Sequence, residues 1–173
     1  EMSNVKHEYY GGEIFAMAGG TIEHDAITAN VTAFFHQALR ESGCRVLTST
    51  MRICTPSGLY TYPDVSIVCG VPDIIRIQGT DTVGNPVVLV EVLSPSTRDY
   101  DRGQKFDLYG SIPTLCDALL IEQSHIELEH RTREPHGPWV SAARTTLAET
   151  VRLSGVSVDL PLARVYEGVA LTQ

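Results

Sequence analysis

Positive charge is scarce in this sequence. Lysine and arginine contribute 13 residues against 21 aspartates and glutamates, which leaves a net charge of −8. A protein that coats nucleic acid non-specifically needs lysine and arginine to neutralise phosphates, so the composition excludes that class. It does not exclude a nuclease, because a metal ion, a local basic patch or a dimer cleft can offset the global charge.

Cysteine is also scarce, and its four copies are Cys44, Cys54, Cys69 and Cys116. None forms a C-x-x-C pair and no histidine pair follows at zinc-finger distance, which argues against a zinc site or a disulfide framework. We therefore expect four reduced, apolar cysteines in a cytoplasmic protein. No apolar run is long enough to cross a membrane and no signal peptide is visible, so no membrane partner is expected.

The sequence has 173 residues, of which 43% are hydrophobic and 20% are charged. Such a chain can bury a proper core, and it contains neither repeats nor a linker, so we predict a single domain over residues 1–173. Gly11 and Gly12 predict a hairpin over residues 7–17. Thr21 is a candidate N-cap for an amphipathic helix over about 22–42, which Gly43 ends.

The remaining elements follow from shorter patterns. Strands are predicted at about 45–53, 65–69, 87–93, 117–122 and 126–130. A loop is expected over 70–86, a hairpin from Trp139, and a short helix within 160–169. Ser96 and Asp99 resemble a capping box, which predicts a second helix over about 97–111. Strands around a central sheet with flanking helices give an α/β or α+β domain.

Glu91 is the most informative residue, because it lies within the apolar run Val87–Leu93. A continuous apolar run is typical of a strand that is covered on both faces. A carboxylate there is costly unless it is paired, hydrogen-bonded or bound to a metal ion. The alternatives are a salt bridge or a strand end that reaches solvent. The pattern alone therefore supports a structural role and a functional role for Glu91 equally.

Asp64 follows Pro63 at the start of the strand predicted at 65–69. An aspartate after proline is commonly a turn or capping residue, and alone Asp64 fits that interpretation better. If the two strands are neighbours, however, Asp64 and Glu91 form a pair of hard oxygen ligands suited to magnesium or manganese. A metal ion there could activate water and neutralise charge on a scissile phosphate.

Lys105 lies in the predicted second helix, four residues after Asp101. A plain ion pair on an exposed helix face, contributing about 0.3–0.5 kcal/mol, explains this spacing by itself. Alternatively the helix folds back over the strand end, and Lys105 holds the attacking water or phosphate oxygens. His24, in the first turn of the first helix, is either a surface or capping residue or a phosphate contact and proton carrier.

Several blocks of residues together are similar to a known family. They are Tyr62-Pro63-Asp64-Val65-Ser66, the run from Val90 to Thr97, and Asp101-x-x-x-Lys105-x-x-x-Tyr109. With the opening His7-Glu8-Tyr9-Tyr10 block and Ile112-Pro113-Thr114-Leu115, they resemble the Uma-two family of bacterial restriction-endonuclease-like proteins, within the PD-(D/E)XK nuclease superfamily. The resemblance covers about residues 6–140, and Glu91–Thr97 is its most specific part.

The resemblance implies a restriction-endonuclease-like core, a central mixed sheet flanked by helices with extra hairpins. It implies that Asp64, Glu91 and the backbone carbonyl of Val92 bind Mg²⁺ or Mn²⁺. The superfamily's lysine normally stands two residues after the second acid, where this sequence has Leu93. Lys105 matches the family's own helix position, which makes Asp64, Glu91 and Lys105 the expected catalytic set, with His24 and Asp101 as accessory residues.

The leading hypothesis is a magnesium-dependent endonuclease that hydrolyses DNA phosphodiester bonds, expected to act as a homodimer. One alternative is a non-catalytic binding or regulatory module that keeps the nuclease fold, which the acidic balance and Leu93 favour. Another is a metal-dependent phosphohydrolase that acts on a small molecule. Fold and site pattern do not by themselves establish a substrate.

Overall fold

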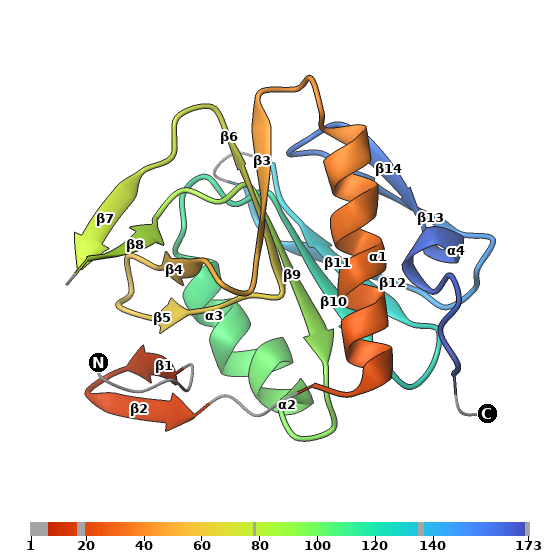
Figure 1. Ribbon diagram of the computed structural model, residues 1–173, viewed down its shortest axis with the longest axis horizontal. Coiled ribbons are helices and arrows are strands. Elements are labelled where there is room, and N and C mark those ends of the chain that lie inside the picture. Colours follow the sequence, from red (N-terminus) through yellow and green to blue (C-terminus); the bar gives the residue numbers. More distant parts are fainter. Residues whose placement is uncertain (1–6, 17–19, 78, 135–136, 172–173) are drawn as a thin grey trace.

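The computed structural model of the protein describes residues 7–16, 20–77, 79–134 and 137–171 (Figure 1). Its central sheet has six strands in the order β12-β11-β10-β9-β6-β3. These strands are β3 (Cys44–Thr48), β6 (Val65–Cys69), β9 (Val88–Leu93), β10 (Asp117–Glu122), β11 (Leu128–Thr132) and β12 (Val140–Arg144). The sheet is mixed, because β9 and β10 are parallel while the other neighbours are antiparallel.

A second sheet is built from short strands in the order β2-β1-β5-β4-β8-β7. They are β1 (His7–Tyr10), β2 (Glu13–Ala16), β4 (Arg52–Cys54), β5 (Tyr60–Thr61), β7 (Ile74–Ile77) and β8 (Thr80–Val83). A separate hairpin joins β13 (Thr150–Leu153) to β14 (Val158–Pro161), and the short helix α4 (Leu162–Val165) follows it.

The helix α1 (Ile22–Ala38) covers one face of the central sheet (Figure 1). The Thr21 side chain accepts a hydrogen bond from the backbone N–H of His24, which is the expected N-cap. Ile27, Val31 and Phe35 recur every four residues and are fully buried against the sheet. The helix therefore forms because one apolar stripe meets the sheet and one hydroxyl caps its start.

The opposite face of the central sheet is covered by the second sheet and by a helical segment, residues 98–109. This segment consists of α2 (Arg98–Tyr100), the turn η1 (Asp101–Lys105), which is kinked at Gly103, and α3 (Phe106–Tyr109). Leu108 and Tyr109 pack with Leu89 of β9 and Ile53 of β4. β9 is thus buried on both faces, as its apolar run predicts.

Several predicted boundaries are wrong where tertiary contacts decide them. The stretch 45–53 is two strands, because β3 pairs with β6 while β4 pairs with β5 and β8. The expected loop 70–86 contains the hairpin β7–β8. The first helix ends at Ala38, before the predicted 42.

The predicted capping box is also wrong. Thr97 is the N-cap residue and makes no side-chain capping bond. The hydroxyls of Ser94, Ser96 and Thr97 bond one another instead, and the backbone N–H of Arg98 donates to the carbonyl of Ser94. The Ser96 and Thr97 hydroxyls are therefore engaged with Ser94 and do not cap the helix.

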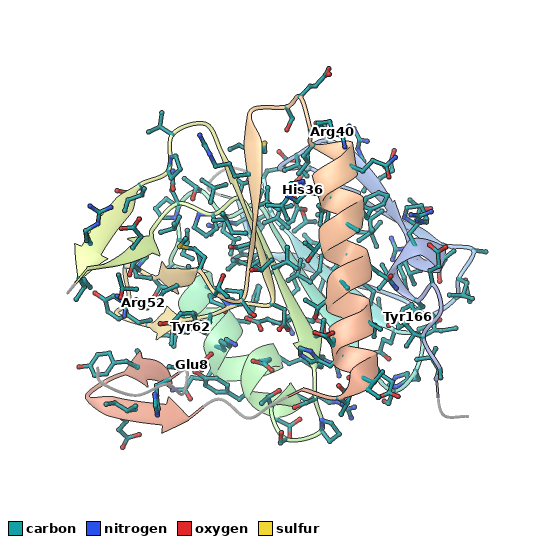
Figure 2. All side chains as sticks on the ribbon, in the orientation of Figure 1. Glu8, His36, Arg40, Arg52, Tyr62 and Tyr166 are labelled. Atoms are coloured by element: carbon teal, nitrogen blue, oxygen red, sulfur yellow. A yellow bond between two sulfur atoms is a disulfide. The ribbon has the colours of Figure 1, made fainter. Side chains whose placement is uncertain are left out.

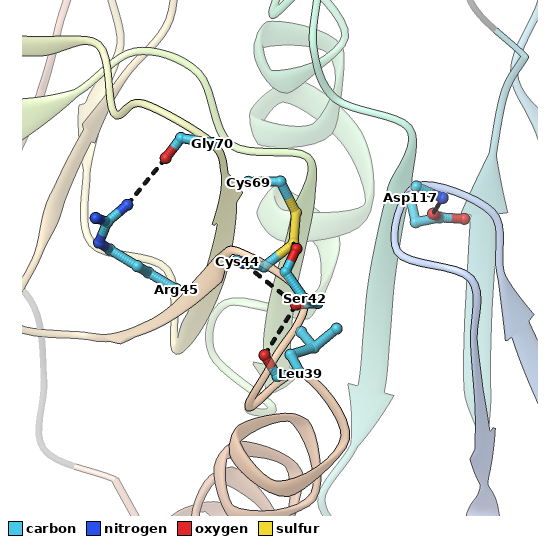
Figure 3. The surroundings of a disulfide bond; sticks show 8 residues. Leu39, Ser42, Cys44, Arg45, Cys69, Gly70 and Asp117 are labelled. Atoms are coloured by element: carbon cyan, nitrogen blue, oxygen red, sulfur yellow. Dashed lines mark hydrogen bonds between the residues drawn. A yellow bond between two sulfur atoms is a disulfide. The ribbon is translucent and has the colours of Figure 1, made fainter.

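The expectation of four reduced cysteines is wrong for one pair. Cys44 of β3 and Cys69 of β6 lie opposite each other in the antiparallel register and form a disulfide bond (Figure 3). Cys54 and Cys116 are free. Cysteine spacing could not reveal this pair, because only the pairing of two distant strands brings the sulfurs together. Within the described residues, no helix is long and apolar enough to cross a membrane.

Candidate active site

The carboxylate of Glu91 lies on the face of β9 that meets the helical segment. Val88, Val90 and Val92 face the α1 layer, so Leu89 and Glu91 point to the other side by strand alternation. Glu91 is only 6% exposed. Its Oε1 accepts a hydrogen bond from the Tyr109 hydroxyl and lies 3.0 Å from Lys105 Nζ. The charged group is therefore held by side chains of the helical segment.

Asp64 directly precedes β6, which pairs with β9 so that Val65 faces Val90. One step further along this antiparallel register, Asp64 comes opposite Glu91 at the same end of the sheet. Asp64 Oδ2 accepts the backbone N–H of Val92 at 2.7 Å and lies 3.3 Å from His24 Nε2. Pro63 lacks an N–H and fits the strand start that carries the aspartate.

Lys105 lies at the centre of three carboxylates. Its Nζ is 3.0 Å from Glu91 Oε1, 3.1 Å from Glu8 Oε1 and 3.1 Å from Asp101 Oδ1. The ion pair between Lys105 and Asp101 thus has the predicted spacing, but it is buried rather than exposed on a helix surface. Gly103 has non-helical backbone angles and kinks the segment between Asp101 and Lys105, both of which are buried.

Two residues of this cluster, Glu8 and Tyr109, stand in the blocks that resemble the family but were not predicted to be site residues. Glu8 is 6% exposed and comes from β1, and it also accepts a hydrogen bond from the Thr61 hydroxyl. Figure 2 shows Glu8 between the N-terminal hairpin and the helical segment. Tyr109 follows Lys105 at helical spacing, so its place on the same face could have been inferred from the i,i+4 rule. Glu8 carries no comparable local signal.

The charges of the cluster perturb one another. Burial raises the pKa of Glu91 to about 8, the charges of Asp101 and Asp64 add to this rise, and Lys105 opposes it. Burial alone would lower the pKa of Lys105, but Glu91 and the other acids outweigh it and raise that pKa well above its usual value. The hydrogen bond to Asp64 raises the pKa of His24, against the effect of burial. The protonation states of Glu91, Lys105 and His24 thus depend on the charges of their neighbours, as is common at functional sites.

Comparisons with known proteins agree with this architecture. A family model named Uma2 and described as "Putative restriction endonuclease" matches residues 1–163. The chain belongs to this family. Two uncharacterized proteins of Synechocystis sp. (strain ATCC 27184 / PCC 6803 / Kazusa) are similar to it. One, slr1290, is 33% identical over 98% of this chain and 88% of its own length. The other, sll1609, is 31% identical over 81% of this chain and 79% of its own length.

A solved structure extends the comparison to the fold. It is a protein from Anabaena variabilis ATCC 29413, described as "a putative nuclease belonging to DUF820", with a TM-score of 0.77. The similarity covers 97% of this chain and 93% of that chain at 14% sequence identity, so it is evidence for the fold alone. The fold class predicted from the sequence, a restriction-endonuclease-like mixture of helices and a central mixed sheet, is confirmed.

Against this family background, the structure brings together most of the residues singled out from the sequence. Glu91, Lys105 and Asp101 are in direct contact, and Asp64 with His24 lies at the same sheet end, joined to β9 through Val92. Leu93, which stands where the superfamily has its lysine, is fully buried. Lys105 reaches Glu91 from the helical segment instead.

The acidic residues of the site fit a divalent metal ion only in part. Over residues 7–171, less the three undescribed gaps, no three His, Cys, Asp or Glu side chains converge on one metal-binding point. Two hard oxygens remain, however, because among those residues neither Asp64 Oδ1 nor Glu91 Oε2 has a hydrogen-bond or ion-pair partner. Two carboxylates with backbone and water oxygens are a ligand set that Mg²⁺ commonly uses.

Proposed function

We propose that this protein is a divalent-metal-dependent nuclease that hydrolyses phosphodiester bonds of DNA. One observation carries the proposal: Asp64, just before β6, and Glu91, near the end of β9, lie on neighbouring strands at the same end of the central sheet, and Lys105 contacts Glu91. Membership of the family described as "Putative restriction endonuclease" supports it, as does the fold shared with the Anabaena variabilis protein. A duplex has two strands, so a symmetric pair of copies remains our prediction for the active assembly.

Asp64, Glu91 and the carbonyl of Val92 would hold Mg²⁺ or Mn²⁺, which supplies an activated water and neutralises charge on the phosphate. The chain's own groups prepare that site. The Val92 N–H and His24 both bind Asp64 Oδ2, which fixes the carboxylate, and Oδ1 has no partner within the part of the chain that the structure describes. Groups that orient a ligand carboxylate in this way usually contribute strongly to metal affinity.

Lys105 would act on the attacking water or on a phosphate oxygen. Its ammonium is buried and positively charged, and it lies beside one of the two ligand carboxylates. A fixed positive charge in a water-excluded site stabilises the charge that develops during phosphoryl transfer. His24, whose side chain is 20% exposed, is the group through which a proton could exchange with solvent.

A nuclease assay on Glu91→Ala tests the proposal. We expect the wild type to cleave DNA with Mg²⁺ or Mn²⁺ and to stop on chelation, and we expect the variant to lose on the order of a hundredfold or more. Asp107→Asn is the matched control, because Asp107 is an exposed acid of the same helical segment. Equal cleavage by the wild type and Glu91→Ala would mean that the nuclease assignment is wrong.

A second candidate function is a binding module that keeps the fold without catalysis. The observation that favours it is that Lys105 lies 3.0 to 3.1 Å from three acids of the protein itself, Glu8, Glu91 and Asp101. This candidate predicts that calorimetry detects no Mg²⁺ binding to the wild type. Magnesium binding that is lost in Asp64→Ala would exclude it.

A further inference from the structure

Glu8 is a buried carboxylate that neither the proposed metal site nor the hydrophobic core requires. It belongs to the second sheet, where β1 pairs with β2 on one side and β5 on the other. Its side chain extends out of that sheet to Lys105 in the helical segment, where Lys105 Nζ lies 3.1 Å from Glu8 Oε1. A carboxylate with 6% exposure is costly unless its partners compensate for the lost hydration.

The hydrogen-bond capacity of Lys105 shows what Glu8 contributes. An ammonium group has three N–H donors and no acceptor. Three carboxylates, those of Glu8, Glu91 and Asp101, lie 3.0 to 3.1 Å from Nζ as ion-pair partners, so the ammonium has as many acid neighbours as it has donors. Lys105 can therefore contact a water molecule or a substrate only after one of these carboxylates withdraws.

The three carboxylates differ in what else they can bind. Glu91 lies beside Asp64 at the sheet end, so a metal ion can compete with Lys105 for it. Glu8 is held from the other side by the Thr61 hydroxyl, and Asp101 is buried four residues before Lys105 on the same segment. Withdrawal of Glu91 toward a metal ion would free one N–H while the other two stay engaged.

We propose that Glu8 is a positioning residue of the active site, which together with Asp101 holds the Lys105 ammonium beside Glu91 and leaves one donor free for substrate. The N-terminal hairpin is then part of the catalytic site as well as of the second sheet. The proposal rests on the nuclease function proposed above. It assigns to Glu8 an effect on turnover, and none on the metal ion itself.

The competing interpretation is that Glu8 only anchors the hairpin, and Thr61→Val separates the two. This nearly isosteric change removes the Thr61 hydroxyl from Glu8 and leaves the contacts of Glu8 with Lys105 and Tyr100. A pure anchor predicts that Glu8→Gln and Thr61→Val weaken folding alike and leave turnover unchanged. Positioning predicts that only Glu8→Gln lowers turnover.

The experiment measures kcat, KM, Mg²⁺ affinity by calorimetry and thermal stability for the wild type, Glu8→Gln, Glu8→Asp and Thr61→Val. We expect kcat of Glu8→Gln to fall about 30- to 100-fold with KM and Mg²⁺ affinity little changed, because a displaced catalytic group costs this much. Glu8→Asp should recover part of the loss. A kcat for folded Glu8→Gln equal to that of the wild type would overturn the proposal.

A measurement that needs no activity makes the result independent of the nuclease assignment. The sequence contains two lysines, Lys6 and Lys105, so labelling lysine with nitrogen-15 gives two side-chain signals that Lys6→Arg assigns. A buried, fully paired ammonium exchanges slowly, and we expect the Lys105 signal to be lost in Glu8→Gln but kept in Thr61→Val. An unchanged signal in Glu8→Gln overturns the proposal. A lost signal together with an inactive wild type overturns the proposed function alone.

Discussion

At one end of the central sheet Asp117 begins β10, and at the other end Glu91 lies near the end of β9. Both carboxylates are buried, with exposures of 0% and 6%. Asp117 accepts hydrogen bonds from His130 Nε2 and from the backbone N–H of Gly155, each at 2.7 Å. Glu91 shares a single ammonium with two other acids. Burial alone would raise the pKa of Asp117, but its donors outweigh burial and lower that pKa, whereas the pKa of Glu91 rises to about 8.

The difference between Asp117 and Glu91 distinguishes an end of the sheet that is structurally restrained from an end that carries the candidate active site. The Cys44–Cys69 disulfide lies in the same surroundings as Asp117 (Figure 3), so covalent and polar restraints gather there. The end with Asp64 and Glu91 instead places three acids around one ammonium, although Glu91 also accepts a hydrogen bond from the Tyr109 hydroxyl. A carboxylate with its own donors stabilises the fold, while one that shares an ammonium with other acids costs stability and remains available to a metal ion.

The largest expected effect comes from removing the disulfide at the structurally restrained end. The bond closes a loop of 25 residues, so Cys44→Ala with Cys69→Ala should lower the free energy of unfolding by about 3.5 kcal/mol. Urea denaturation measures the loss, and Cys116→Ala, a free cysteine, is the control. Thiol titration of the unfolded wild type without reductant should find two free thiols. Finding four would contradict the pairing.

Replacing Asp117 removes the polar restraint at the same end. Asp117→Asn should cost about 3 kcal/mol at neutral pH, because His130 loses its buried partner. The folded-state pKa of Asp117 lies below its ordinary 3.8, so the stabilisation is present above that pH and is lost as pH falls further. The difference between wild type and variant should therefore shrink below about pH 4.

The control for Asp117 is Asp159→Asn. Asp159 also pairs with a cation, Arg152, but its side chain is 61% exposed. Such a surface pair contributes about 0–1 kcal/mol. Equal destabilisation by the two substitutions would show that the donors of Asp117 have no special weight, and the contrast between the two ends would fail.

The fold was predictable where local patterns and burial agree. The helix α1 follows from Thr21 and the spacing of Ile27, Val31 and Phe35, and β9 follows from its apolar run. The division of 45–53 between two sheets was not predictable, because the two halves have similar patterns and only their partners differ. The disulfide escaped for the same reason, since strand register places Cys44 opposite Cys69.

The candidate site divides in the same way. Glu91 could be singled out because a carboxylate within an apolar strand requires an explanation. Asp64 gained weight only as its neighbour, and Lys105 only through the family resemblance. Glu8 stands in a block that resembles the family, but no role could be assigned to it, because its partners Thr61, Lys105 and Tyr100 lie far along the chain. Side chains that meet through tertiary packing leave no spacing in the sequence.

The smallest expected effect, and the sharpest test of the contrast, is the pH dependence of Glu91→Gln. Between pH 4.5 and about 8, folded Glu91 holds a proton that the unfolded chain releases. This raised pKa means that the stability contributed by Glu91 is lost as pH rises through that window, the opposite of Asp117. Glutamine carries no such proton, and Lys105 keeps Glu8 and Asp101 as partners.

Relative to the wild type, Glu91→Gln should therefore gain about 1 kcal/mol of unfolding free energy from pH 6 to pH 7. Urea denaturation at the two pH values measures this gain, and Glu41→Gln, an exposed glutamate after α1, should show none. If the wild type and Glu91→Gln change in parallel, Glu91 is ionised throughout and its lysine satisfies it as fully as His130 and Gly155 satisfy Asp117. The two ends of the sheet would then hold their carboxylates in the same way, and the surplus of acid beside Asp64 would no longer favour a metal ion.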